Sequence, residues 1–151
     1  MIIDSSLEMA DAALITNAVA ANVKKGDAIN LHPLIADNAT VDFSAGEQMF
    51  FVLEVTTAFV GSGASVNILL TTATDEALTG TPITIWETTV LGVGSFPVGT
   101  RWKISLPKAD YKQWLGLRVT TSGATTTAGA VNAFLTKDVN QWTSTNTRVN
   151  V

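Results

Sequence analysis

The sequence predicts an all-β protein, and three observations support this. Short runs rich in β-branched and aromatic residues recur along the 151-residue chain, separated by turns of Gly, Pro and Thr. Charged residues make up only 15% of the chain, whereas exposed helices usually carry Glu and Lys on their wet face. No repeat of fixed period is visible, so neither a propeller nor a solenoid is expected. The length suits one domain, and we expect an antiparallel sandwich, jelly roll or barrel.

Residues 1–25 allow two interpretations. Alanines and a leucine recur at three- and four-residue spacing between Ala10 and Ala21, which is typical of a helix with an apolar face. Val19, Ala21 and Val23 also alternate, as they would in a strand. Local propensity favours the helix. The residues alone leave both interpretations open.

The next segment, residues 26–46, is expected to be a long connection. Gly26, Pro33, Asn38 and Gly46 interrupt it. Apolar pieces at 28–31 and 41–43 indicate one or two short strands within it.

Residues 48–59 are the predicted central strand. Their odd-numbered positions are apolar almost throughout, whereas the even-numbered positions change from Phe50 and Val52 to Glu54 and Thr56. This pattern suits a strand that is buried on one side and partly covered on the other. Because Glu54 and Thr56 lie on the partly covered face, both are candidate partner contacts.

Further strands are expected downstream of this central strand. Gly61–Ala64 is predicted to be a hairpin turn between antiparallel neighbours, since its glycines tolerate positive φ. Residues 91–100 contain three glycines and a proline, and are expected to cross irregularly. Alternation predicts that Trp102, Ile104 and Leu106 face the core together. It likewise places Leu115, Leu117 and Val119 on one face of their strand. The predicted strands are 65–72, 81–90, 101–106, 113–121 and 129–136.

Composition and charge argue against several classes of function. The chain contains no Cys, which excludes disulfides and thiolate metal ligands. A formal charge of -4 and scattered basic residues argue against nucleic acid as a partner. The longest apolar runs, such as residues 49–53, are far shorter than the roughly 20 residues of a membrane helix. With Asp4 where a signal peptide would carry basic residues, we expect a soluble protein made inside the cell, with no membrane partner.

No catalytic set is recognisable in the sequence. His32, the one histidine, lies in a proline-containing connection without a nucleophile motif, and is expected to be an ordinary loop residue. Asp75 and Glu76 are adjacent in a loop and would point apart, whereas Glu54 and Glu87 lie on predicted strands and face solvent or a partner. One His and no Cys do not build an ordinary transition-metal site. We therefore expect no enzyme activity and no cofactor.

The C-terminal segment, residues 139–151, is polar yet contains a large aromatic residue. It buries too little to order itself, so one interpretation is a frayed terminus with an incidental Trp142. The other is an extended arm that folds onto a neighbouring chain with Trp142 as its anchor. Trp142 and Arg148 are therefore candidate partner contacts. The weakly charged, Thr-rich composition suits either a surface covered by another protein or an ordinary β-protein surface.

Several local patterns, taken in order, resemble a known family. They are Met1–Asp4, Asp11-Ala12, Gly46-Glu47, Val55–Phe59, Asn67–Glu76, Trp114–Val119 and Thr126–Val131. In order and spacing they are similar to the small capsid cement, or decoration, proteins of tailed bacteriophages, of the type first described for a Bordetella phage. The resemblance covers residues 1–138, less closely over 24–45. Residues 24–42 are longer than is usual in the family, and residues 139–151 extend past its usual end.

The resemblance implies a fold: a jelly-roll-like antiparallel β-sandwich with extended N-terminal and C-terminal arms. The domain would comprise residues 1–138, with 1–25 as an N-terminal strand or arm, followed by a polar tail over 139–151. It therefore favours the extended interpretation of residues 1–25.

The resemblance also implies a function. A non-enzymatic protein without cofactors would bind the outer surface of a bacteriophage head, bridge major capsid protein subunits and stabilise the mature shell. It would be made in the host cytoplasm and reside on the virion, as a homodimer or, alternatively, a homotrimer. Two other functions stay open: a tail or baseplate structural component, and a carbohydrate-binding β-sandwich that stacks sugars on Trp86, Trp102, Trp114 and Trp142.

Overall fold

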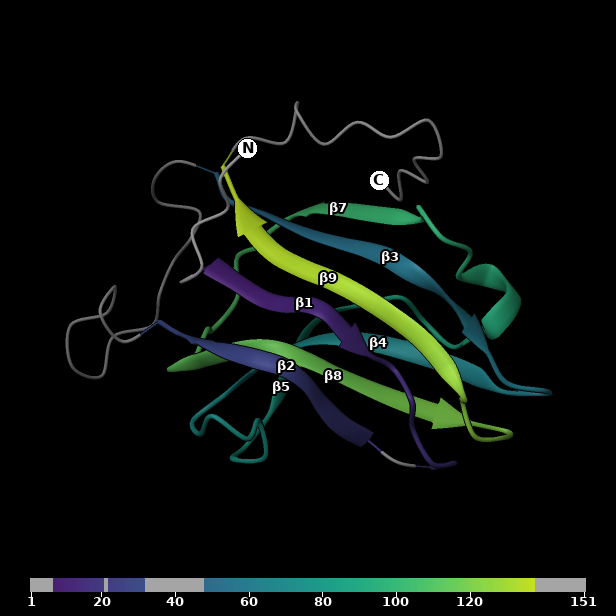
Figure 1. Ribbon diagram of the computed structural model, residues 1–151. Helices are drawn as coiled ribbons and strands as arrows, with labels where there is room; N and C mark the ends of the chain where they lie inside the picture. The colour runs from purple at the N-terminus through teal and green to yellow at the C-terminus, as the bar shows by residue number, and fades with distance from the viewer. Residues whose placement is uncertain (1–6, 21, 32–47, 138–151) are drawn as a thin grey trace.

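Two antiparallel sheets face each other in the computed structural model, which describes residues 7–20, 22–31 and 48–137 (Figure 1). The strands are β1 (Glu8–Leu14), β2 (Asn22–Asn30), β3 (Phe50–Val60), β4 (Ser65–Ala73), β5 (Ile83–Glu87), β6 (Leu91–Gly92), β7 (Arg101–Ser105), β8 (Trp114–Ser122) and β9 (Ala128–Thr136), with a 3-10 turn, η3, at Val93–Ser95.

The strand order is that of a jelly roll. The first sheet has the order β1-β9-β3-β7, and the second has the order β2-β8-β4-β5 with β6 also paired to β4. Strands that follow one another in the chain mostly lie in opposite sheets, as in the double-sheet jelly roll. The predicted all-β, jelly-roll-like sandwich is confirmed.

The predicted central strand, β3, lies between β9 and β7 in the first sheet. Phe51, Leu53 and Val55 point into the core, as the alternation predicted. The register then shifts twice, between Val55 and Thr57 and between Thr57 and Val60. Thr57 is exposed, whereas Phe59 is again buried in the core. Bulges of this kind interrupt the alternation locally, and periodicity alone does not reveal where they lie.

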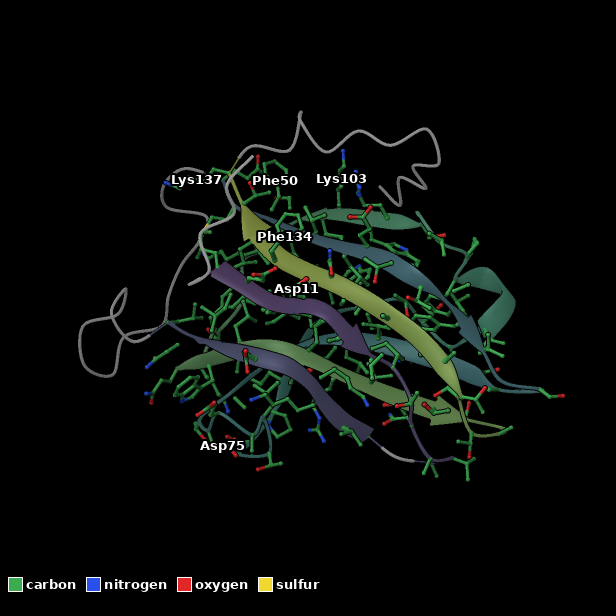
Figure 2. All side chains as sticks on the ribbon, in the orientation of Figure 1. Asp11, Phe50, Asp75, Lys103, Phe134 and Lys137 are labelled. Carbon is green, nitrogen blue, oxygen red and sulfur yellow. The ribbon has the colours of Figure 1, made fainter. Side chains whose placement is uncertain are left out.

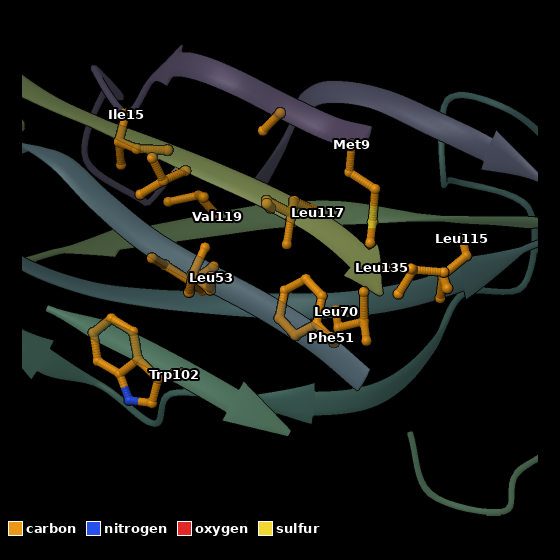
Figure 3. Close-up of a cluster of buried hydrophobic side chains, with 14 of the residues drawn as sticks. Met9, Ile15, Phe51, Leu53, Leu70, Trp102, Leu115, Leu117, Val119 and Leu135 are labelled. Atoms are coloured by element: carbon orange, nitrogen blue, oxygen red, sulfur yellow. The ribbon is translucent and has the colours of Figure 1, made fainter. Parts of the chain in front are cut away.

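The core fills the space between the sheets (Figure 3). Leu53 and Phe51 of β3 meet Leu117 and Leu70 of the second sheet, and Trp102 enters from β7. The inward faces predicted for 102–106 and 115–119 are both confirmed. Aromatic rings extend the core toward one end, where Phe59 stacks on Phe96 with ring centroids 4.6 Å apart.

The N-terminal region is extended, so the helical interpretation of residues 10–25 was wrong. β1 is an edge strand paired to β9, and β2 is an edge strand paired to β8. Gly26 has φ +67°, and a Cβ atom there would lie 2.1 Å from the Met9 carbonyl oxygen. The two edges therefore meet closely at Gly26, and this packing outweighs the modest helix propensity of the alanines.

Gly61–Ala64 is not a hairpin between paired neighbours, so that prediction was wrong. The turn itself is tight, with the Ala64 N–H donating to the Gly61 carbonyl at 3.2 Å. However, β3 and β4 belong to different sheets. Turn residues determine the local chain reversal, whereas the burial of apolar faces determines which strands pair.

Candidate partner-binding surfaces

Glu54 lies on the outer face of the first sheet and forms an ion pair with Arg101. The two residues are register partners on β3 and β7, and the Arg101 side chain donates to the Glu54 carboxylate. Arg101 is only 9% exposed. Lys103, two residues along β7, has a pKa lowered by burial and by the charge of Arg101. The carboxylate of Glu54 thus has a partner within the chain, and its contact with another protein stays a prediction.

Thr56, the next outward residue on β3, is half-buried. Its hydroxyl oxygen has no hydrogen-bond partner among the described residues. Buried hydroxyl groups are normally bonded, so this oxygen is an exception, although it is itself shielded from solvent. Contact between Thr56 and a partner likewise stays a prediction.

The same outer face carries apolar side chains beside Glu54. Val52 and Phe134 are register partners on β3 and β9, and both are buried although neither belongs to the core between the sheets. Phe50 and Phe134 lie near one another on this face in Figure 2. The outer face of the first sheet is therefore not a plain solvated surface, in agreement with the partly covered face predicted for β3.

Three residues singled out in the sequence lie outside the described residues. They are His32 and the candidate contacts Trp142 and Arg148. The apolar piece 41–43 also lies outside them.

The described tryptophans do not line up on an exposed surface. Trp102 is buried and packs against Phe96, with ring centroids 5.7 Å apart. Trp86 is half-buried and packs against Phe51, with ring centroids 5.8 Å apart, and Trp114 is half-buried at the start of β8. A ring that stacks a sugar must be exposed; Trp102 is not, whereas Trp86 and Trp114 are partly exposed, and sugar binding stays a prediction.

Asp75 and Glu76 belong to a connection that folds over the outer face of the second sheet. The Asp75 carboxylate accepts from the Thr79 hydroxyl (2.6 Å) and from backbone N–H groups, and these hydrogen bonds lower the pKa of Asp75. Glu76 lies 3.8 Å from the ammonium of Lys24 on β2. Both carboxylates thus hold the connection in place, rather than forming a pair for general acid–base work.

Leu78 anchors this connection, a role that the sequence analysis missed. Its side chain is fully buried and covers Gly116 of β8, and its carbonyl accepts from Arg118 at 2.9 Å. The available signal was one large apolar residue in an otherwise polar loop.

A hollow of about 440 Å³ lies between β1 and β2. Its lining includes the acidic residues Glu8, Asp11 and Asp27. Among residues 7–20, 22–31 and 48–137, no three His, Cys, Asp or Glu side chains are arranged to hold a metal ion. Nor does any helix in that part of the chain have the length and apolarity to cross a bilayer.

The fold and these surfaces define the chain as a jelly-roll β-sandwich whose charged side chains mostly serve internal contacts. The chain belongs to the Bbp16 family, because the model of that family matches residues 9–135. The match runs from β1 to β9 and so covers both sheets. The family name suggests a protein of a Bordetella phage. A search of curated proteins found no match to the chain.

Proposed function

We propose that the protein is a non-enzymatic cement, or decoration, protein on the outer surface of a bacteriophage head. It bridges major capsid protein subunits and stabilises the mature shell. The observation that carries this proposal is membership of the Bbp16 family over the whole sandwich, together with the ordered sequence resemblance to phage cement proteins.

The physical basis is selective binding to the assembled shell. A protein that binds the assembled state and not the separated subunits stabilises the assembled state by mass action. Repetition of the same contact around a shell, and contact with two subunits at once, reinforce each binding event through a high effective concentration. A rigid two-sheet body suits this role, because it loses little conformational freedom on binding.

The decisive experiment compares phage heads with and without this protein. Heads that lack it should break at lower temperature and at lower ionic strength than complete heads, and added purified protein should restore their resistance. Equal resistance of the two preparations would refute the proposal. Electron microscopy that places the protein on tails instead of heads would also refute it.

Self-association is part of the proposal, with a homodimer favoured over a homotrimer. Two copies joined at a seam would each hold a different capsid subunit, which doubles the number of contacts per assembly. Sedimentation equilibrium of the purified protein measures the oligomeric state directly. If the protein is strictly monomeric and still restores the resistance of the heads, the proposed self-association is wrong.

Deletion of residues 139–151 tests the polar tail. The truncated protein should fold as before, since the last strand of the described residues ends at Thr136, but it should bind heads more weakly. Trp142→Ala in the full chain should reproduce most of the loss if Trp142 is the anchor. Unfolding curves serve as the control for folding, and unchanged binding of the truncated protein would contradict the prediction.

A further inference from the structure

At one end of the sandwich, the connections between strands contain no charged residue among those that the structure describes. Four connections lie there, joining β1 to β2, β3 to β4, β5 to β7, and β8 to β9. We call this surface the charge-free end; it lies at the right in Figure 1. It comprises residues 12–20, 22–23, 55–66, 88–100 and 119–130, which contain no Asp, Glu, Lys, Arg or His.

Strand pairing brings these distant segments together. The ends of β1, β3 and β9 meet in the first sheet, and the ends of β2, β4, β6 and β8 meet in the second. The register pairs that join them are Leu14–Ala130, Val60–Ala128, Asn22–Thr120, Ser65–Ser122 and Ser65–Gly92.

The charges lie elsewhere in the molecule. The connections at the opposite end, and the end of β9, carry Asp75, Glu76, Lys108, Asp110, Lys112 and Lys137. Asp75 and Lys137 are seen at that end in Figure 2. Lys25 reaches the charge-free end from β2, but its ammonium donates to the Thr16 carbonyl at 3.0 Å. Charged residues of both signs are therefore concentrated away from the connections of the charge-free end.

Exposed apolar side chains gather on the same end. The described residues include seven large apolar side chains that are exposed, and six of them belong to the charge-free end, each between 41% and 65% exposed. The exception is Ile83, at the start of β5. Exposed apolar side chains that gather on one part of a surface favour it as a site of interaction. The six are Leu14, Val19, Val23, Val60, Val90 and Val98.

Buried hydrogen bonds hold the loops of this end in fixed positions. The Asn17 N–H donates to the Thr126 hydroxyl oxygen at 2.9 Å, and that hydroxyl donates to the Ile15 carbonyl at 2.7 Å. Gly123 lies so close to the β3–β4 turn that a Cβ atom there would be 2.4 Å from the Gly63 oxygen. A surface fixed in this way loses little entropy when a partner covers it.

We propose that the charge-free end is the surface that docks on the shell, and that its counterpart there is an apolar protein surface without charged groups. This inference rests on the proposed function. A charged partner group would lose its water here, and the one ammonium that reaches this end, that of Lys25, already donates to the Thr16 carbonyl. Nucleic acid needs several clustered cations, and the connections of this end supply none. Covering apolar surface, by contrast, is favourable in proportion to the area removed from water.

The shape of this end favours a seam between capsid subunits over a second copy of the chain. The β3–β4 and β8–β9 connections project from the sandwich in Figure 1. Two projecting tips meet over a small area, whereas a stable interface buries about 800 Å² on each partner. A tip that enters a seam also buries its sides, and so reaches that area more readily.

The test introduces one charge at a time. Val60→Lys and Val98→Lys place an ammonium on the charge-free end, and Ile83→Lys places one on the exposed apolar residue outside it. All three positions are exposed, so unfolding curves should match that of the wild type. Binding to phage heads that lack the protein is measured for each variant. Val60→Lys and Val98→Lys should lose affinity at least about a hundredfold, as an uncompensated buried charge requires, whereas Ile83→Lys should bind as the wild type does.

Each other outcome has a separate meaning. If the wild type binds and the two charge-free-end variants bind equally well, the docking proposal is overturned while the proposed function stands. If the wild type does not bind heads, the docking proposal and the proposed function are both refuted. If the two variants abolish a wild-type dimer in sedimentation and still bind heads normally, the surface is occupied by a second copy, and the docking proposal is overturned.

Discussion

At the scale of single residues, the ion pair on the outer face of the first sheet shows how burial changes the role of a carboxylate. Glu54→Gln removes the charge that faces the nearly buried Arg101. We expect a loss of about 2 kcal/mol in the free energy of unfolding, measured by urea denaturation. The matched control is Glu87→Gln, because Glu87 is exposed and its replacement amide still accepts from Asn67. Equal effects of the two substitutions would contradict this assignment.

Tyr111 provides a second test at this scale, because it is the one tyrosine of the chain. Its hydroxyl donates to the Pro107 carbonyl at 2.7 Å, and burial raises its pKa from 10.0 to about 12. Between these values the unfolded chain has lost the phenolic proton and the folded chain has kept it, so stability should fall as pH rises above 10.

The measurement for Tyr111 is ultraviolet absorbance of the tyrosinate during an alkaline titration. The folded protein should ionise near pH 12, and the denatured protein near pH 10. Tyr111→Phe should remove this part of the alkaline loss of stability. A folded-state midpoint near 10 would show that the hydroxyl is accessible to water.

At the scale of elements, the close approach of β1 and β2 depends on Gly26. Gly26→Ala would place a Cβ atom 2.1 Å from the Met9 oxygen, so one of the two edge strands must move. Gly63→Ala is the matched control, because Gly63 also has positive φ but no neighbour within 4 Å of its Cβ position. Backbone strain should lower the free energy of unfolding of both variants by about 1–2 kcal/mol. Gly26→Ala should lower it substantially further, because of the contact with Met9, and thermal unfolding measures both. Equal losses would mean that β1 and β2 separate easily.

The connection over the second sheet makes a related point about elements. Polar composition predicted a loop at 73–80, and the structure has one, yet Leu78 ties it to Gly116. The loop is thus a packed cover over β8, since its single large apolar side chain is fully buried.

At the scale of the whole molecule, segregation of charge makes a prediction about salt. A contact through the charge-free end contains no ion pair, so binding to heads should change less than about twofold when salt rises from about 0.1 to 1 M, although the Debye length shortens from about 10 to 3 Å. Binding measurements across this range provide the test. A loss of tenfold or more would show that charged residues carry the contact.

The strands themselves were largely predictable from the sequence, and their partners were not. Alternation located β3, β7 and β8 and their inward faces, because apolar residues at every second position of a strand point to the buried face. The bulge after Val55 and the sheet change at Gly61–Ala64 depend on residues far away in the chain. For the same reason, Glu54 could be named as a candidate contact while its ion pair with Arg101 could not be foreseen.

The sequence alone determined the all-β class, the low charge and the resemblance to phage cement proteins, since these depend on local composition and order. Only the tertiary structure decided which strands pair, that residues 8–14 form an edge strand, and that four uncharged segments share one end. Each segment is unremarkable by itself as a turn of small residues. Their common surface exists because the jelly roll folds four separate connections onto the same end of the sandwich.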